Sequence, residues 1–154
     1  MATGVLTNPQ NFPPYTGFQL YTPALTGATN DPVATYTTQF GKFAIIGPLV
    51  FFKFVLVTST MTKSTLTDAL RITLPLVSAT NTGDVTVFKA RVENATAVAN
   101  ALQGEIASNT AYATFRNYAA LATAGVQTTY AATDPGIGVL TNTITFQGSG
   151  FYEY

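Results

Sequence analysis

The segment from Leu49 to Thr58 constrains the fold more than any other part of the chain. In a β-strand, alternate residues point to opposite sides. One side then carries Leu49, Phe51, Lys53, Val55 and Val57, and the other carries Val50, Phe52, Phe54 and Leu56. A half-buried strand alternates apolar and polar residues, so a strand that is apolar on both sides must be covered on both. A second sheet, an arm of the chain or another subunit could provide the second cover.

Extended segments with a period of two residues, separated by turn signals, account for most of the remaining chain. We expect strands at 18–25, 34–46, 49–58, 70–76, 85–93, 111–116, 126–131, 139–146 and 151–154. Gly47-Pro48 predicts a turn, and Gly41 predicts a bulge. The stretch 95–113 combines helix-tolerant alanines with repeated Asn and Thr, and we interpret it mainly as a loop. With no amphipathic helix and no fixed-period repeat, the sequence predicts an all-β, antiparallel β-sandwich or jelly roll.

The 154 residues are enough for one domain. We expect a single sandwich domain over 18–154 and an extended N-terminal arm over 1–17, where three prolines favour extended geometry. Phe12, Tyr15 and Phe18 are the candidate anchors of this arm. A frayed terminus is the alternative, but a solvated tail gains nothing from aromatic residues.

The composition excludes several kinds of chemistry. Charged residues make up 9% of the chain, the net charge is zero, and there is no His, Cys or Trp. Zinc fingers, disulfides and nucleophile–His pairs are therefore excluded. The seven basic residues are scattered along the sequence, which argues against a nucleic-acid partner. The most apolar window, 43–57, is too short for a membrane helix, and the N-terminus has no features of a secretory signal.

The acidic residues carry no catalytic signature. A glycosidase needs two facing carboxylates, and no pair among the seven is supported by a motif. Asp31, Asp84 and Asp134 lie in loop contexts and are interpreted as turn residues. We interpret Gly136-Ile-Gly138 and Gly148-Ser-Gly150 as hairpin or tail glycines, and the sequon at Asn94 as a chance match. We expect no catalytic, metal-binding or cofactor-binding residues.

The aromatic residues divide into two groups. Alternating aromatics in strands are usually buried, so we expect a domain core or subunit interface at Phe51, Phe52, Phe54, Phe88 and Phe146. Val50, Phe52, Phe54 and Leu56 form the leading candidate for such a buried face. Tyrosine hydroxyls suit a wet rim or an interface edge, and we assign this role to Tyr36, Tyr112, Tyr118 and Tyr130.

Three stretches carry information beyond composition. They are FQLYTPALTG at 18–27, TYTTQFGKFAIIGPLVFFKF at 35–54 and LRITLPL at 70–76. Their order and spacing resemble a jelly-roll-like module of tailed-phage virion structural proteins, found in capsid decoration (cement) proteins and in tail-fibre or spike heads. Tyr21 stands where this module often has Trp, and Thr73 stands where it typically has Gly. The C-terminal half of the chain is similar to the module only in its β-rich character.

The resemblance implies a jelly-roll-like domain, usually a homotrimer within a phage particle, and no catalytic residues. We therefore expect a non-enzymatic decoration protein on the capsid surface of a virion, in contact with the major capsid protein or other virion proteins. The arm would clamp a neighbour, and the low charge predicts binding that depends little on salt. The alternative is a tail-fibre or spike head that binds host-surface glycans. We expect no membrane or nucleic-acid partner.

Overall fold

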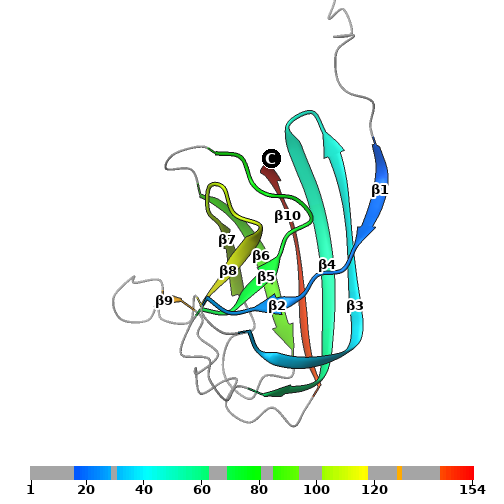
Figure 1. The fold of residues 1–154 in the computed structure, drawn as a ribbon, viewed down its shortest axis with the longest axis vertical. Coiled ribbons are helices and arrows are strands. Elements are labelled where there is room, and N and C mark those ends of the chain that lie inside the picture. Colours follow the sequence, from blue (N-terminus) through cyan, green and yellow to red (C-terminus); the bar gives the residue numbers. More distant parts are fainter. Residues whose placement is uncertain are drawn as a thin grey trace, which may run out of the picture.

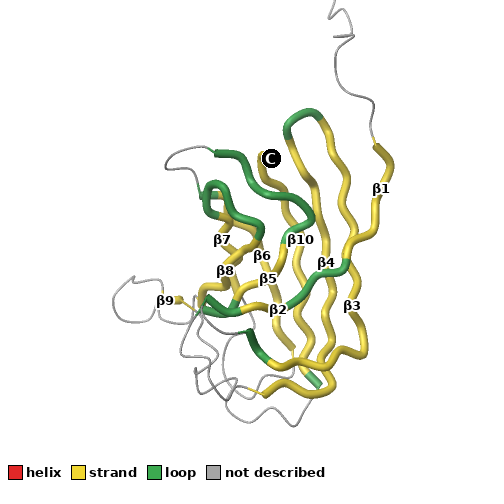
Figure 2. The backbone as a smooth tube through the Cα atoms, viewed as in Figure 1, coloured by secondary structure: helices red, strands yellow, loops and turns green. Residues whose placement is uncertain are grey.

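The computed structural model describes residues 16–28, 31–62, 69–80, 85–93, 102–117, 128–129 and 143–154. Within these ranges the chain is all-β, every strand pair is antiparallel, and no helix is present (Figures 1 and 2). The strands are β1 (Thr16–Tyr21), β2 (Leu25–Thr26), β3 (Val33–Ile46), β4 (Leu49–Thr62), β5 (Arg71–Thr73), β6 (Thr86–Glu93), β7 (Leu102–Ile106), β8 (Tyr112–Asn117), β9 (Thr128–Thr129) and β10 (Ile144–Glu153). The predicted fold class, an antiparallel β-sandwich of jelly-roll type, is confirmed.

One sheet curls on itself to make both layers of the sandwich. Its strand order is β1-β3-β4-β10-β6-β7-β8-β5-β2, with β9 paired to β8. In Figure 1, β3, β4 and β10 stand side by side, and the shorter strands β5 to β8 form the other part of the curl. The C-terminal strand β10 therefore joins the long hairpin to the β6–β8 meander.

The β3–β4 hairpin is the longest feature of the sheet, with 14 residues in each strand. Both strands are rich in β-branched and aromatic residues, which suit a pleated surface. The predicted turn is present at Gly47, whose φ of 60° is a left-handed conformation that glycine adopts without strain. β4 has a paired neighbour on each side: β3 within the hairpin and β10 on the other edge.

Side-chain hydrogen bonds link β2, at one end of the strand order, to β3 near the other. The Leu25 amide donates to the Tyr36 hydroxyl at 2.9 Å, and Gln39 Nε2 donates to the Pro23 carbonyl at 2.8 Å. On its other side, the β2 segment is held by the Thr73 amide, which donates to the Ala24 carbonyl at 3.0 Å. These contacts hold the curl partly closed, so the inner faces of the two layers meet.

The core lies between these layers and is dominated by aromatic rings. Phe52 and Phe54 of β4 both make edge-on contacts with Phe88 of β6, with ring centroids 5.0 Å and 6.2 Å apart. Phe115 of β8 packs on Phe146 of β10 at 6.0 Å. Edge-on and offset ring pairs of this kind add to the stabilisation from apolar burial. The rings therefore join the long hairpin to the meander across the sandwich.

Several strand predictions need correction. Gly41 is not at a bulge, because its pairing with Phe54 continues the regular register; the irregularities lie between Thr35 and Thr38. The expected loop around 102–106 is strand β7. Gly148 and Gly150 are neither hairpin nor tail glycines but lie inside β10, which runs unbroken from Ile144 to Glu153. The expected segment 18–25 is two strands, β1 and β2.

Candidate interaction surface

The four residues of the leading candidate face lie inside the domain. Val50, Phe54 and Leu56 have no exposed surface, and Phe52 is 4% exposed. All four belong to the hydrophobic core of this single chain. They therefore pack within the domain, and any interface with another subunit must use other residues. Of the five phenylalanines expected to be buried, Phe52, Phe54, Phe88 and Phe146 are in the core, whereas Phe51 is 38% exposed.

The opposite side of the same sheet is the outer face. We use this name for the residues of β1, β3, β4, β10 and β6 that point away from the core. Large apolar side chains remain exposed on it, at Phe18, Leu20, Phe40, Ile46, Phe51, Val87 and Phe151. Leu20 is the most open of these, at 74%. Large apolar side chains left exposed on one face of a small domain support an interaction site there.

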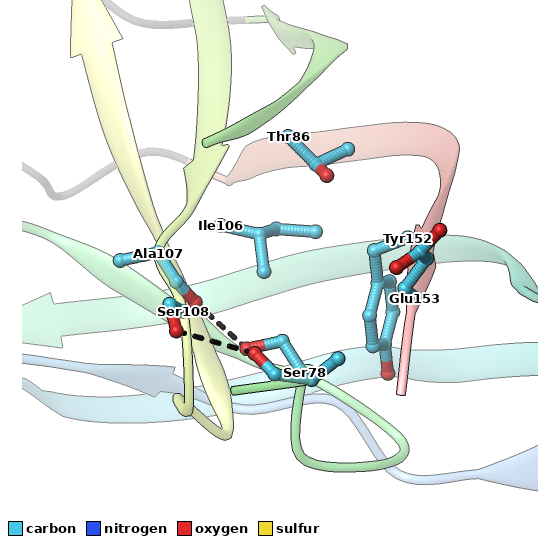
Figure 3. Close-up of a pocket in the computed structure, with 8 residues that line it drawn as sticks. Ser78, Thr86, Ile106, Ala107, Ser108, Tyr152 and Glu153 are labelled. Atoms are coloured by element: carbon cyan, nitrogen blue, oxygen red, sulfur yellow. Dashed lines mark hydrogen bonds between the residues drawn. The ribbon is translucent and has the colours of Figure 1, made fainter. Parts of the chain in front are cut away.

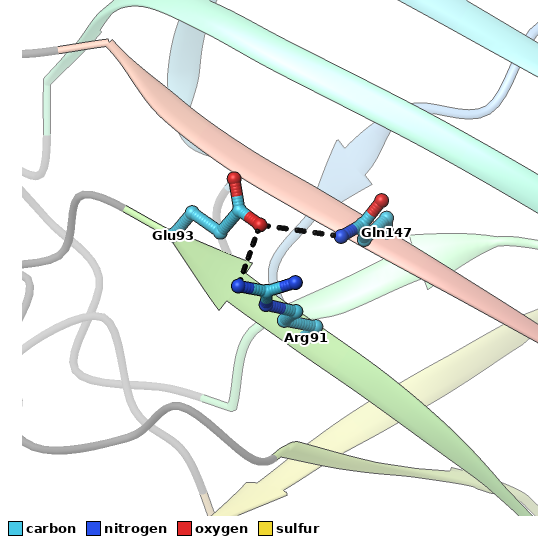
Figure 4. Close-up of polar contacts among 3 residues, drawn as sticks. All are labelled: Arg91, Glu93 and Gln147. Atoms are coloured by element: carbon cyan, nitrogen blue, oxygen red, sulfur yellow. Dashed lines mark hydrogen bonds and ion pairs between the residues drawn. The ribbon is translucent and has the colours of Figure 1, made fainter.

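Several residues of the outer face contact one another. The Phe51 and Phe151 rings, on adjacent strands, lie 5.6 Å apart with their planes tilted by 35°. The Lys42 ammonium lies 4.7 Å from the centre of the Phe18 ring. The Arg91 guanidinium lies 3.0 Å from the Glu93 carboxylate, which also accepts a 3.5 Å hydrogen bond from Gln147 Nε2 (Figure 4). These exposed contacts order the surface more than they stabilise it.

A small pocket lies at the end of the sandwich, between the Ser78 loop, the end of β7 and the end of β10 (Figure 3). Its cavity volume is about 30 Å³, well below the roughly 300 Å³ or more of typical ligand pockets. The Ser78 hydroxyl donates to the Ala107 carbonyl at 2.7 Å and accepts from the Thr110 amide at 2.9 Å. The Ser78 hydroxyl therefore connects loop backbone groups, and the space is too small for an organic substrate.

The described acidic residues have structural partners. Asp31 Oδ1 accepts a 3.1 Å hydrogen bond from the Gly27 amide, as expected for a turn residue. Glu105 pairs with Arg116 at 2.7 Å across β7 and β8. No cluster of three or more potential metal ligands occurs among the described residues. Asp84, Asp134 and the Asn94 sequon lie outside the described residues.

Two tyrosines expected at a rim take part in internal contacts. Tyr36 is half-buried and accepts the Leu25 hydrogen bond described above. Burial raises the pKa of Tyr36 above its ordinary value, while the hydrogen bond from Leu25 partly offsets this rise. The Arg71 guanidinium carbon lies over the Tyr112 ring, 4.0 Å from the centre of that ring. Tyr118 and Tyr130 lie outside the described residues.

Of the three candidate arm anchors, only Phe18 is described. It lies in β1, two residues after the strand begins at Thr16, and its side chain is 63% exposed. Phe12 and Tyr15 lie outside the described residues. The sequence predicts that both sides of the Leu49 strand are covered, with the even-numbered side as the leading candidate; the structure leaves Phe51, on the odd-numbered side, 38% exposed.

No helix in the described part of the chain is long and apolar enough to cross a membrane. Comparison of the chain with protein-family models, with characterised proteins and with solved structures finds no significant match.

Proposed function

We propose that the chain is a non-enzymatic structural protein of a tailed-phage particle, a homotrimeric decoration protein that stabilises the capsid shell. The observation that carries the proposal is the exposed apolar outer face, seven of whose large side chains remain open to solvent in the single chain. A face of this kind supports a role performed by binding rather than by catalysis. The trimer and the phage particle come from the resemblance of residues 18–76 to virion modules.

Binding to the assembled shell would stabilise it by mass action, because such a protein binds the assembled state and not the free subunits. The rigid β3–β4–β10 layer suits this role, since its outer residues are held by ladder hydrogen bonds on both sides of β4. A partner could bury these side chains without first ordering the backbone, which lowers the entropic cost of binding.

The test is to quantify the chain in purified particles of the virus that encodes it. A decoration protein should be present in an amount comparable to the major capsid protein. A much smaller amount, comparable to fibre proteins, would support the alternative glycan-binding head. Absence from the particle would contradict both.

A truncation tests the role expected for the arm. Removing residues 1–15 leaves β1 complete, because this strand begins at Thr16. We expect the truncated chain to melt as the full chain does but to lose its binding to particles. Normal decoration by the truncated chain would show that the arm is not the clamp.

A further inference from the structure

Lysines that are scattered in the sequence lie in one row across the outer face. Lys42 of β3 pairs directly with Lys53 of β4, Lys53 with Ser149 of β10, and Ser149 with Lys89 of β6. Neighbouring strands lie about 4.8 Å apart, so the row spans roughly 14 Å. Three of the seven basic residues of the chain thus occupy one line across four strands.

These lysines have no acidic partner in the described part of the chain. The ion pairs found there join Arg91 to Glu93 and Arg116 to Glu105. Lys42 lies over the Phe18 ring, and Lys53 and Lys89 are exposed. Like charges directly opposite each other on paired strands destabilise a sheet, as Lys42 and Lys53 do here. Ion pairs within the described part of the chain therefore do not account for the row.

Apolar side chains border the row on both sides. On one side lie Phe51 and Phe151, which pair with each other on β4 and β10. On the other side lie Phe40 and Val55, which pair with each other. A partner that covers these apolar residues would also cover the lysines, and desolvated cations need opposite charges.

We propose that the outer face binds a different protein through a surface where carboxylates, spaced roughly 5 to 10 Å apart, lie among apolar side chains. If the proposed function holds, this acidic and apolar surface belongs to a capsid protein. The identity of the partner therefore rests on the proposed function, whereas the chemistry of the contact does not. The resulting contact is salt-sensitive, in contrast to the salt-insensitive binding expected from composition.

A second copy of the chain fits this face poorly. Two copies packed face to face would set one lysine row against the other, and like-charge contacts in an interface are costly. The described carboxylates offer no row that matches three lysines: Glu93 and Glu105 are paired with arginines, Asp31 caps a turn, and Glu153 stands beside Leu49 at one end of the outer face. The trimer contact therefore lies elsewhere on the chain.

A single-stranded nucleic acid also fits poorly. Such ligands stack bases on open aromatic faces within a basic groove. Here the Phe51 and Phe151 rings contact each other at 5.6 Å and the Lys42 ammonium lies over the Phe18 ring, so these rings already have partners within the face. The chain as a whole has no net charge.

The test compares three full-length proteins. They are the wild type, the variant Lys42→Gln/Lys53→Gln/Lys89→Gln, and the control Ala28→Glu/Thr80→Glu/Ala111→Glu. Both variants lower the net charge by three, but the control changes exposed residues outside the outer face. Each protein is titrated against particles that lack the chain, at low and moderate salt. If the triple lysine variant does not fold, the single changes Lys53→Gln and Lys89→Gln replace it.

We expect the lysine variant to bind about tenfold or more weakly and to lose most of its salt dependence, because it removes three charge contacts that are each worth up to about fivefold in affinity. The control should stay within about twofold of the wild type. Equal binding by the lysine variant and the wild type, or an equal loss in the control, would overturn the proposal. Binding of a thymidine oligonucleotide to the wild type that disappears in the lysine variant would also overturn it.

A carbodiimide, which joins an amine to a carboxylate in contact with it, identifies the partner residues. Cross-links from Lys53 or Lys89 to carboxylates of another protein support the proposal, and cross-links only to copies of this chain contradict it. If the wild type does not bind particles at all, the proposed function fails. The same cross-linking in cells that produce the chain then decides the lysine proposal on its own.

Discussion

Tyr152 and Tyr21 differ in the hydrogen bonds that their hydroxyl groups make. The Tyr152 hydroxyl donates to the Leu76 carbonyl at 2.8 Å and accepts from the Leu76 amide at 3.1 Å. The Tyr21 hydroxyl is buried and has no hydrogen-bond partner within the described part of the chain. A buried hydroxyl that is satisfied stabilises the fold, whereas an unsatisfied one costs the desolvation of its polar atom.

Replacing each tyrosine by phenylalanine should therefore have different effects. Tyr152→Phe leaves both Leu76 backbone groups without this partner, and we expect the free energy of unfolding to fall by about 1–3 kcal/mol. Tyr21→Phe removes an unpaired group, so stability should stay the same or rise by up to about 1 kcal/mol. Urea unfolding of the two variants and the wild type measures the difference. Equal destabilisation by both changes would show that the Tyr21 hydroxyl has a partner.

At the residue scale, the sequence predicts which side chains share a buried face but not whether that face is a domain core or a subunit interface. Alternation correctly groups Val50, Phe52, Phe54 and Leu56, all of which lie in the core. It could not tell a domain core from a subunit interface, because both are apolar. The row of lysines could not be predicted from the sequence either, because it depends on the register of β10 between β4 and β6.

At the scale of the element, β4 presents two apolar faces with different surroundings. Phe54 has no exposed surface, while its near neighbour Phe51 is 38% exposed. Phe54→Ala should lower the free energy of unfolding by about 3–5 kcal/mol, because it opens a cavity among packed rings. Phe51→Ala should cost about 1 kcal/mol or less.

Charged substitutions separate the two faces more sharply. Phe54→Asp should prevent folding, because it buries an unpaired carboxylate. Phe51→Asp should yield a folded domain with native circular dichroism and a similar melting temperature. If Phe51→Asp also fails to fold, the outer face is covered within the single chain.

A glycine in β7 makes room for a core ring. Gly104 pairs with Phe88, and a Cβ atom built at Gly104 would overlap the Phe88 ring. That ring is held edge-on against Phe52 and Phe54, so we expect Gly104→Ala to destabilise the domain by about 1–3 kcal/mol. Gly17→Ala is the matched control in β1, because nothing lies within 4 Å of its added Cβ. Thermal melting that is the same in both variants would contradict this packing.

Glycines that make room for core rings also explain why the sequence predicts two strands, at 139–146 and 151–154, where the structure has the single strand β10. Gly148 and Gly150 lie in a GSG sequence that is typical of a turn. In β10 they pair with Phe54 and Phe52, and Cβ atoms at the two glycines would approach Phe54 and Phe88. The residues that make glycine suitable here come from strands distant in the sequence, so local patterns could not reveal it.

At the scale of the whole molecule, long-range pairing sets the fold. The all-β class follows from alternation and turn residues, but the position of β10 between β4 and β6 does not. The same holds for the partial closure of the curl, which depends on Tyr36 and Gln39 reaching the β2 segment. The outer face exists because β1, β3, β4, β10 and β6 are consecutive in this order.

Buried and half-buried tyrosines on three strands of this sheet also predict how the whole domain responds to alkali. Burial raises the pKa of Tyr152 in β10 to about 12, from an ordinary value of 10.0. Burial likewise raises the pKa of Tyr21 in β1 and of Tyr36 in β3. The folded state therefore holds these protons more tightly than the unfolded state does. The contribution of Tyr152 to stability is complete below pH 10.0 and is lost as the pH rises through about 12.

We expect one cooperative unfolding transition in this alkaline range, with tyrosinate absorbance from the buried hydroxyls and loss of the β-sheet circular dichroism signal occurring together. Tyr21→Phe should move the midpoint to higher pH, because it removes a group whose ionisation opposes folding. If all eight tyrosines ionised near their ordinary pKa while the circular dichroism stayed native, the three hydroxyls would have to be open to solvent. The packing of β1, β3 and β10 described here would then be wrong.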